Sequence, residues 1–350
     1  MFSKQPLSFY IFGFGLVMLA SYVGNQYRQT FQDDDRDEEY RMVKDYLLND
    51  SPLYGNNKPK LWIHSKYEIN ARQWKSFLSR NSTDINQPYL YLTIQSIIRH
   101  CGDDFHVCLI DDESFARLIP TWDVDLHTIP EPMRSRYRDM GMVQLLQLYG
   151  GMVVPNSFLC TRPLIEMYQT GIEGKIPFVV EKTKQCVRNN AVNSNPFIPD
   201  IRMMGAAKND PMLEEMLVIM KTRERKGHFS QETEFLGETE KWCVQQIQEQ
   251  KMRCIDGNAV GIKTKCGIPI LLEELMSENY LDVDNRLLFG ISIPSEEMLR
   301  RPKYSWFAIL PYEDVLNSNV ILTKYFQASI VDDEILEAGR KEKIRDLIAI

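Results

Sequence analysis

The sequence predicts an α/β fold in which helices cover a parallel β-sheet. Short apolar runs that are typical of buried strands alternate with longer segments of helical periodicity, most clearly between residues 61 and 154. This alternation is the rhythm of strand, helix, strand units. With 350 residues, of which 44% are hydrophobic, the chain can bury one large core. We therefore expect one main domain, with an N-terminal membrane anchor and α-rich additions at the C-terminal end.

The expected elements follow from this pattern in chain order. In the first half they are a strand at 61–64, a helix at 89–101, a strand at 105–110, helices at 112–119 and 135–149, and a strand at 152–154. In the second half they are strands at 178–181, near 202–206 and at 287–293, and helices at 211–226 and 233–249. The main domain is expected to span residues 58–330 and to be followed by an amphipathic helix within 331–350.

The N-terminal 25 residues are expected to anchor the chain in a membrane. Residues 7–23 form an uncharged apolar run, and about 17 to 25 residues are needed to cross a bilayer as a helix. No clear small-residue cleavage site follows, so an anchor is favoured over a cleaved signal. Residues 26–57 are acidic and turn-rich, which predicts a stalk and linker. More basic residues follow the apolar run than precede it, so the charge pattern does not favour export of the main domain.

Composition excludes some partners. The net charge of -7 gives no general attraction to nucleic acid, and no convincing basic patch is present, so nucleic acid is not an expected partner. Seven cysteines are scattered without a Cys-x-x-Cys pair, which argues against a structural zinc site. A partial set of disulfides, with at least one thiol left over, is an alternative that the sequence allows.

The segment at 138–160 carries the most specific pattern. A helix with Asp139 ends at Gly150-Gly151, a buried strand follows, and the triplet Pro155-Asn156-Ser157 comes next. This framework resembles the DXD-type glycosyltransferases that include initiating alpha-1,6-mannosyltransferases and capsular polysaccharide synthesis proteins. In that family the helix carries Asp-x-x-Arg and the strand delivers Asp-x-Asp, which holds a divalent metal. Here Met142 occupies the arginine position, and the triplet occupies the Asp-x-Asp position.

The resemblance extends over residues 58–225. It includes Ile63-His64 at the end of the first strand and a segment of small residues, a charged turn and proline at 202–211. Residues 85–92 are also similar to a segment of uncharacterised membrane-anchored proteins of large DNA viruses. The resemblance implies a glycosyltransferase A-like, Rossmann-like sheet that binds a nucleotide-sugar, and a glycan or glycoprotein acceptor. It also implies a domain that faces the Golgi or ER lumen.

Ligands of such sheets bind beyond the carboxyl ends of the strands. The three ends expected at this edge carry His64, Asp111-Asp112 and the triplet. The triplet lacks the carboxylates that a hard cation requires. Mn²⁺ or Mg²⁺ is therefore expected only if Asp111 and Asp112 form a replacement site. The alternative is that Asp112 caps the following helix and Asp111 lies in the turn.

Four more polar side chains precede or begin the helix that leads to Gly150. Arginines at the start of a helix can hold a diphosphate without a metal, although the same residues can form a solvated loop. These residues are Arg134, Arg136, Arg138 and Asp139. Asp139 lies on the apolar stripe of the helix, where an acid must be paired, so it either anchors a loop or binds a ligand hydroxyl. His64 either contacts the nucleotide or is a core histidine.

The sequence thus predicts a membrane-anchored, glycosyltransferase-like protein with a lost or altered metal site, which transfers a hexose from a nucleotide-sugar. Two alternatives stay open. The first is an inactive protein of the same fold that serves as a tethered scaffold or binding partner. The second is a structural protein of a membrane-bounded particle.

Overall fold

A computed structural model describes residues 58–65, 87–183, 197–226 and 232–330. The chain divides into units 1–51 and 52–350, and all described residues belong to the second. The expected anchor at 7–23, the acidic stalk and the helix within 331–350 lie outside the described residues. In the part that is described, no helix is both long and apolar enough to cross a bilayer.

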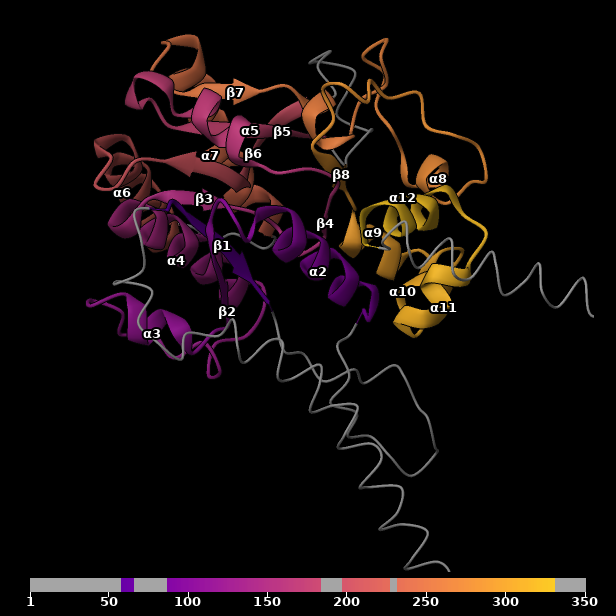
Figure 1. Cartoon of the computed structure of the whole chain (residues 1–350). Helices are drawn as coiled ribbons and strands as arrows, with labels where there is room; N and C mark the ends of the chain where they lie inside the picture. Colours follow the sequence, from indigo (N-terminus) through magenta and orange to yellow (C-terminus); the bar gives the residue numbers. More distant parts are fainter. Residues whose placement is uncertain (1–57, 66–86, 184–196, 227–231, 331–350) are drawn as a thin grey trace, which may run out of the picture. The chain divides into compact units, whose positions relative to one another are not determined.

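The fold is α/β, with a six-stranded sheet of order β2-β1-β3-β6-β5-β7 (Figure 1). The strands are β1 Lys60–His64, β2 His106–Ile110, β3 Gly151–Val153, β5 Phe178–Thr183, β6 Phe197–Ala206 and β7 Arg253–Ile255. Five of these strands run in the same direction, and β6 pairs antiparallel with both β3 and β5. The sheet is therefore mostly parallel rather than fully parallel as expected. The segment between β5 and β6 carries no helical pattern, and a parallel crossover usually needs a helix.

Six helices belong to the part of the chain that forms this sheet. They are α2 Tyr89–Cys101, α3 Ser114–Leu118, α4 Met133–Tyr149, α5 Ile165–Gly171, α6 Pro211–Lys226 and α7 Glu232–Gln248. The predictions of α2 and α6 are confirmed to the residue. The sheet lies in the hydrophobic core. In β1, the consecutive residues Leu61, Trp62 and Ile63 are all fully buried, which shows that both faces of this strand are covered.

The turn between α4 and β3 sets the position of α4. Gly150 and Gly151 have φ of 70° and 102°, which side chains other than glycine rarely adopt. A Cβ on Gly151 would lie 2.1 Å from the Lys60 carbonyl oxygen, so β3 can approach β1 only because this residue is glycine. The Trp62 indole also donates a hydrogen bond to the Gly150 carbonyl at 3.0 Å. The predicted Gly-Gly turn is confirmed.

The C-terminal additions are α-rich, as expected. They comprise α8 Leu272–Leu275, α9 Ser295–Arg300, α10 Ser305–Ala308, α11 Tyr312–Asn317 and α12 Ile321–Ile330, with a small sheet of β4 Phe158–Cys160 and β8 Gly290–Ser292. Of the strand expected at 287–293, only β8 forms. These elements share one hydrophobic cluster with α2, in which Tyr89, Phe307 and Phe326 are fully buried. The cluster ties α2 and β4 to the C-terminal helices.

Candidate functional site

The carboxyl ends of β1 and β2 bring His64 and Asp112 together. The two strands pair in parallel with His64 opposite Ile110, so the residues that follow β2 lie next to His64. His64 Nε2 lies 2.9 Å from Asp112 Oδ1. The His64 ring also stacks on Phe115 of α3, with ring centroids 5.4 Å apart. His64 is therefore a partly buried, hydrogen-bonded residue at the sheet edge.

Arg138 of α4 binds the same carboxylate from the other side. Its Nε lies 2.8 Å from Asp112 Oδ1 and its Nη2 lies 2.6 Å from Oδ2, while Nη1 lies 3.1 Å from Glu131 Oε1. Arg138 is only 5% exposed. A bidentate arginine–carboxylate pair is strong and specific in geometry. Arg138 thus fixes the start of α4 to the end of β2.

The pairing controls the charge of Asp112. Burial raises the pKa of the Asp112 carboxyl, but the hydrogen bonds from Arg138 and His64 outweigh burial and hold that pKa well below its ordinary value. Asp112 is therefore ionised at neutral pH, and its charge is balanced inside the protein.

Asp111 lies in the turn before α3, as expected. Its Oδ1 accepts hydrogen bonds from Ser114 N at 2.9 Å and from Ser114 Oγ at 2.7 Å, and Ser114 Oγ accepts one from Asp111 N. The residue before α3 is Glu113, whose side chain makes no capping hydrogen bond. Asp112 is left to face His64 and Arg138. The expectation that Asp112 would cap the helix is wrong, because the serine three residues after Asp111 suits Asp111 better.

Arg134 and Arg136 also lie within α4, so the alternative of a solvated arginine loop is wrong. Arg136 is 3% exposed, and its Nη1 lies 3.4 Å from Glu224 Oε2 of α6. Arg134 is half-buried, and its Nε donates to the Ile129 carbonyl at 2.9 Å. Both arginines belong to the first turns of the helix: Arg136 meets a carboxylate of α6, and Arg134 binds a backbone carbonyl.

Asp139 binds an arginine that sequence reasoning missed. Arg202 of β6 donates to the two carboxylate oxygens from Nε at 3.0 Å and Nη2 at 3.2 Å. Its Nη1 lies 3.8 Å from Glu296 Oε1 of α9. Asp139 is 9% exposed, so the prediction that this acid must be paired is confirmed. The expectation that a buried Asp139 requires a cationic partner was the one signal in the sequence that pointed to Arg202.

Arg202 lies near the triplet that occupies the metal-binding position. β3 ends where Val153 pairs with Met204 of β6, and Arg202 precedes Met204 by two residues. The antiparallel register therefore places Arg202 beside the point where β3 leads into Pro155. Its side chain is 36% exposed, in contrast to that of Arg138. A partly exposed guanidinium thus lies at the sheet edge beside Pro155.

The triplet itself is held by its backbone. The Asn156 carbonyl accepts a hydrogen bond from Thr93 Oγ1 of α2, and the Ser157 carbonyl accepts one from Ile293 N at 3.1 Å. Ser157 is 8% exposed. Neutral side chains in this position supply no charge for a divalent cation.

The carboxylates nearby do not fit a metal site. Among the described residues, no group of three or more His, Cys, Asp and Glu side chains is arranged to hold an ion. Asp111 accepts hydrogen bonds from Ser114, and Asp112 is bound by Arg138 and His64. A cation would have to displace these partners, so we derive no step through a metal.

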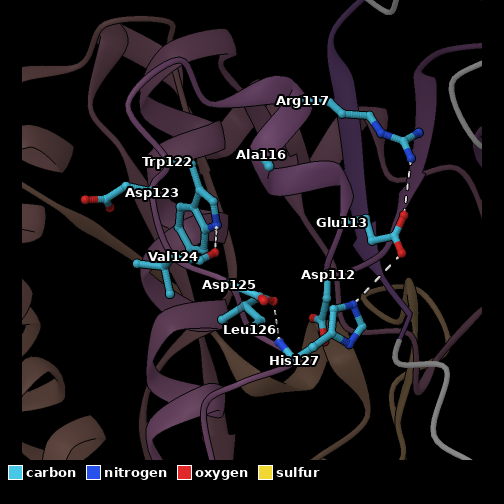
Figure 2. A pocket seen from close by; sticks show the side chains of 10 residues that line it. All are labelled: Asp112, Glu113, Ala116, Arg117, Trp122, Asp123, Val124, Asp125, Leu126 and His127. Atoms are coloured by element: carbon cyan, nitrogen blue, oxygen red, sulfur yellow. Dashed lines mark hydrogen bonds and ion pairs between the residues drawn. The ribbon is translucent and has the colours of Figure 1, made fainter.

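A pocket of about 470 Å³ opens next to this edge, between α3 and residues 122–127 (Figure 2). Trp122 forms one wall. Its ring stacks on Phe115 at 5.0 Å, and its indole donates to the Val124 carbonyl at 2.7 Å. The lining also contains four carboxylates, from Asp112, Glu113, Asp123 and Asp125, and a single arginine, Arg117. This acidic lining repels a diphosphate.

Comparisons with known proteins give little further identification. No protein-family model matches the chain, and no curated protein matches it. A solved structure titled "PaToxG Glycosyltransferase" is similar to it, with a TM-score of 0.31 and 10% identity over 62% of this chain and 78% of that chain. A likeness of this size transfers no residue roles, so the function is argued from the site.

Proposed function

We propose that this protein is a glycosyltransferase-like protein that binds a nucleotide-sugar at the carboxyl edge of its sheet without a divalent cation. In this proposal Arg202 faces the diphosphate of the donor. The observation that carries it is the position of Arg202, half-exposed beside Pro155-Asn156-Ser157 and oriented by Asp139. We infer a hexose as the sugar, a glycan or glycoprotein as the acceptor, and residues 7–23 as the membrane anchor.

The chemistry requires a positive charge at this place. When the bond between the sugar C1 and the phosphate oxygen breaks, negative charge develops on the leaving diphosphate. A fixed guanidinium can stabilise that charge, because its planar donors match phosphate oxygens. Asp139 binds Nε and Nη2 of Arg202 and so fixes the plane of the guanidinium, while Nη1 lies 3.8 Å from Glu296 Oε1. In this proposal a phosphate oxygen of the donor competes for this guanidinium.

The remaining charged residues of the site have positioning roles in this proposal. Arg138 and Arg136 are buried and bound by Asp112 and Glu224, so they hold α4 rather than the ligand. His64 and Asp112 form the floor next to the acidic pocket. That pocket suits a neutral, polyhydroxylated group better than a phosphate, because a tryptophan face and carboxylates bind sugar C–H and O–H groups.

A non-catalytic binding protein is the second candidate. The observation that favours it is that the four charged groups nearest the sheet edge already neutralise one another in two pairs, Asp112 with Arg138 and Asp139 with Arg202. Such pairs can hold a fold together without any turnover.

The test is thermal-shift titration of the full chain in detergent with UDP- and GDP-hexoses, each with manganese or with EDTA. The Arg202→Met variant is compared with Arg223→Met, which removes an exposed arginine of α6 that pairs with Glu238. We expect a stabilisation by the donor that persists in EDTA, is lost in Arg202→Met and is kept in Arg223→Met. Release of free nucleoside diphosphate then separates a transferase from a binding protein.

Two outcomes contradict the proposal. Stabilisation that requires manganese would show that a carboxylate site exists and that Arg202 does not replace it. No stabilisation by any donor would overturn nucleotide-sugar binding and leave the tethered binding protein.

A further inference from the structure

Two buried cysteines face each other across the contact between α2 and β4. Cys101 is the last residue of α2, and Cys160 is the last residue of β4. Their sulfur atoms are 3.9 Å apart, and both residues are fully buried. A disulfide has a sulfur–sulfur distance of about 2.05 Å, so the two sulfurs need to approach by only about 2 Å.

Hydrogen bonds fix the backbone around this pair. Ser96 Oγ, one turn and a half before Cys101 in α2, accepts a hydrogen bond from Cys160 N at 2.9 Å. Ser329 Oγ of α12 donates to the Cys160 carbonyl. Thr93 Oγ1 of α2 donates a hydrogen bond to the carbonyl of Asn156, four residues before Cys160. Because α2 and the segment up to Cys160 are held together at several points, the two thiols meet in every folded molecule.

We propose that Cys101 and Cys160 form a disulfide when the protein folds in the presence of a small-molecule disulfide such as glutathione disulfide. The pairing does not depend on the proposed nucleotide-sugar site. It follows from two sulfur atoms that the fold brings into contact with no other group between them.

The reaction is a pair of thiol–disulfide exchanges. The Cys101 thiolate attacks one sulfur of glutathione disulfide, whose sulfur–sulfur bond breaks and releases one glutathione thiolate. Cys160 then loses its proton and attacks the Cys101 sulfur of the mixed disulfide, which releases the second glutathione. Two protein thiols are oxidised, and one glutathione disulfide is reduced to two thiols.

In the folded protein, the hydrogen bond from Cys160 lowers the pKa of Cys101, whereas burial raises the pKa of Cys160. These surroundings exist only once the fold has formed, so in the unfolded chain either thiolate can attack first. Both sulfurs are inaccessible in the folded protein, so exchange takes place during folding or when α2 separates from β4. We therefore expect the folded, reduced protein to oxidise slowly.

The crosslink would enclose half of the candidate site. Its ends are 59 positions apart, and the loop between them contains β2, α3, α4 and β3, with Asp112, Arg138 and the triplet. A disulfide that closes a long loop removes conformational freedom from the unfolded chain and so stabilises the fold. The oxidised protein should melt about 5 °C or more above the reduced protein.

The test is to fold the full chain with reduced glutathione alone or with added glutathione disulfide, to alkylate it under denaturing conditions, and to map the peptides by mass spectrometry. We expect a linked Cys101–Cys160 peptide only in the oxidised sample, and a higher melting temperature for that sample. Cys160→Ala should abolish the link, whereas Cys108→Ala should keep it. Cys108 is the matched control, because it is also buried but, among the described residues, its sulfur contacts the His106 carbonyl and no second cysteine.

Alkylation of both Cys101 and Cys160 in the oxidised wild-type protein would overturn the proposal, and so would a link from either residue to a third cysteine. Equal melting temperatures of the linked and reduced proteins would overturn the predicted stabilisation. The wild-type peptide map decides the pairing even if a variant fails to fold. Because no nucleotide-sugar is present, these results are independent of donor binding.

Discussion

The Arg202 guanidinium of β6 binds both carboxylate oxygens of Asp139 on α4, at 3.0 Å and 3.2 Å. This contact joins a strand and a helix that lie 63 positions apart in the chain. It also brings a cation to the sheet edge beside a triplet that has lost its carboxylates. Whatever ligand the protein binds there, the Asp139–Arg202 pair determines where that charge lies.

The first prediction concerns the stability of this pair. Asp139→Asn should lower the free energy of unfolding by about 1–3 kcal/mol, because it leaves a half-buried arginine without its main partner. Urea denaturation at pH 7 measures the change. Asp123→Asn is the control, since Asp123 is an exposed acid for which the described residues provide no hydrogen bond, and it should change stability by less than about 0.5 kcal/mol. Equal stability of Asp139→Asn and wild type would show that the pair contributes nothing.

The second prediction concerns pH. The pKa of the Asp112 carboxyl is lower in the folded protein than its ordinary value of 3.8. Its ionised form therefore stabilises the fold above about pH 5, and this contribution is lost as the pH falls below about 4. Asp112→Asn should cost about 2–3 kcal/mol at pH 7, because Arg138 is buried and would lose its bidentate carboxylate partner.

Urea denaturation of wild type and Asp112→Asn at pH 7, 5, 4 and 3.5 tests this second prediction. The difference in unfolding free energy should be constant from pH 7 to 5 and should narrow at pH 4 and 3.5. Asp111→Ala serves as a neighbouring control that removes the carboxylate bound by Ser114 and should cost about 1 kcal/mol at pH 7. A difference between Asp112→Asn and wild type that grows toward acid pH would contradict the sign of the pKa shift.

Local signals in the sequence were sufficient for much of the fold. α2 begins after Pro88 and ends before Gly102, and α4 ends at Gly150, so proline and glycine mark these boundaries. The apolar run at 61–63 likewise predicts a strand that is buried on both faces of the sheet, as β1 is. The reversed direction of β6 could not be predicted, because it depends on which neighbours the strand pairs with and not on its own residues.

The site was only partly predictable for the same reason. Asp139 could be recognised as an acid that needs a partner, but its partner belongs to a distant strand, and nothing near Arg202 distinguishes it from other exposed arginines. Asp111 and Asp112 are adjacent in the sequence, but they differ in their contacts: Ser114 binds the carboxylate of Asp111, and Arg138 binds that of Asp112. Periodicity predicts which elements meet, whereas the identity of each ion pair requires the packed structure.

The third prediction concerns the stacked rings beside the pocket. A Cβ on Gly141 of α4 would lie 2.7 Å from the Phe115 ring, which is fully buried between His64 and Trp122. Gly141→Ala should therefore destabilise the protein by about 1–3 kcal/mol, although alanine is the better helix former. Gly237→Ala in α7 is the matched control, because a Cβ there meets nothing within 4 Å. It should stabilise the protein by about 0.5–1 kcal/mol. The same sign for both variants in urea denaturation would contradict the predicted contact.

The last prediction concerns the Gly-Gly turn. Gly150 and Gly174 both have a φ of 70°, but the ψ of Gly150 is -172°, a conformation that essentially only glycine adopts, whereas the ψ of Gly174 is 13°, in the left-handed helical region. They also differ in their surroundings: a Cβ on Gly150 would lie 2.7 Å from the backbone nitrogen of Lys208, whereas a Cβ on Gly174 meets nothing within 4 Å. Gly174→Ala should cost about 1 kcal/mol, from strain alone.

Gly150→Ala should cost at least about 2 kcal/mol more than Gly174→Ala, because its ψ is more strained for alanine and because the contact is with backbone that cannot rotate away. Urea denaturation of both variants measures this difference directly. If both cost the same, neither the ψ of Gly150 nor the close approach of the turn to Lys208 constrains the fold. If Gly150→Ala costs more, the turn depends on both the conformation and the small size of glycine. Glycine at position 150 then fixes where α4 ends, and so holds the start of α4, with Arg138 and Asp139, against Asp112 and Arg202.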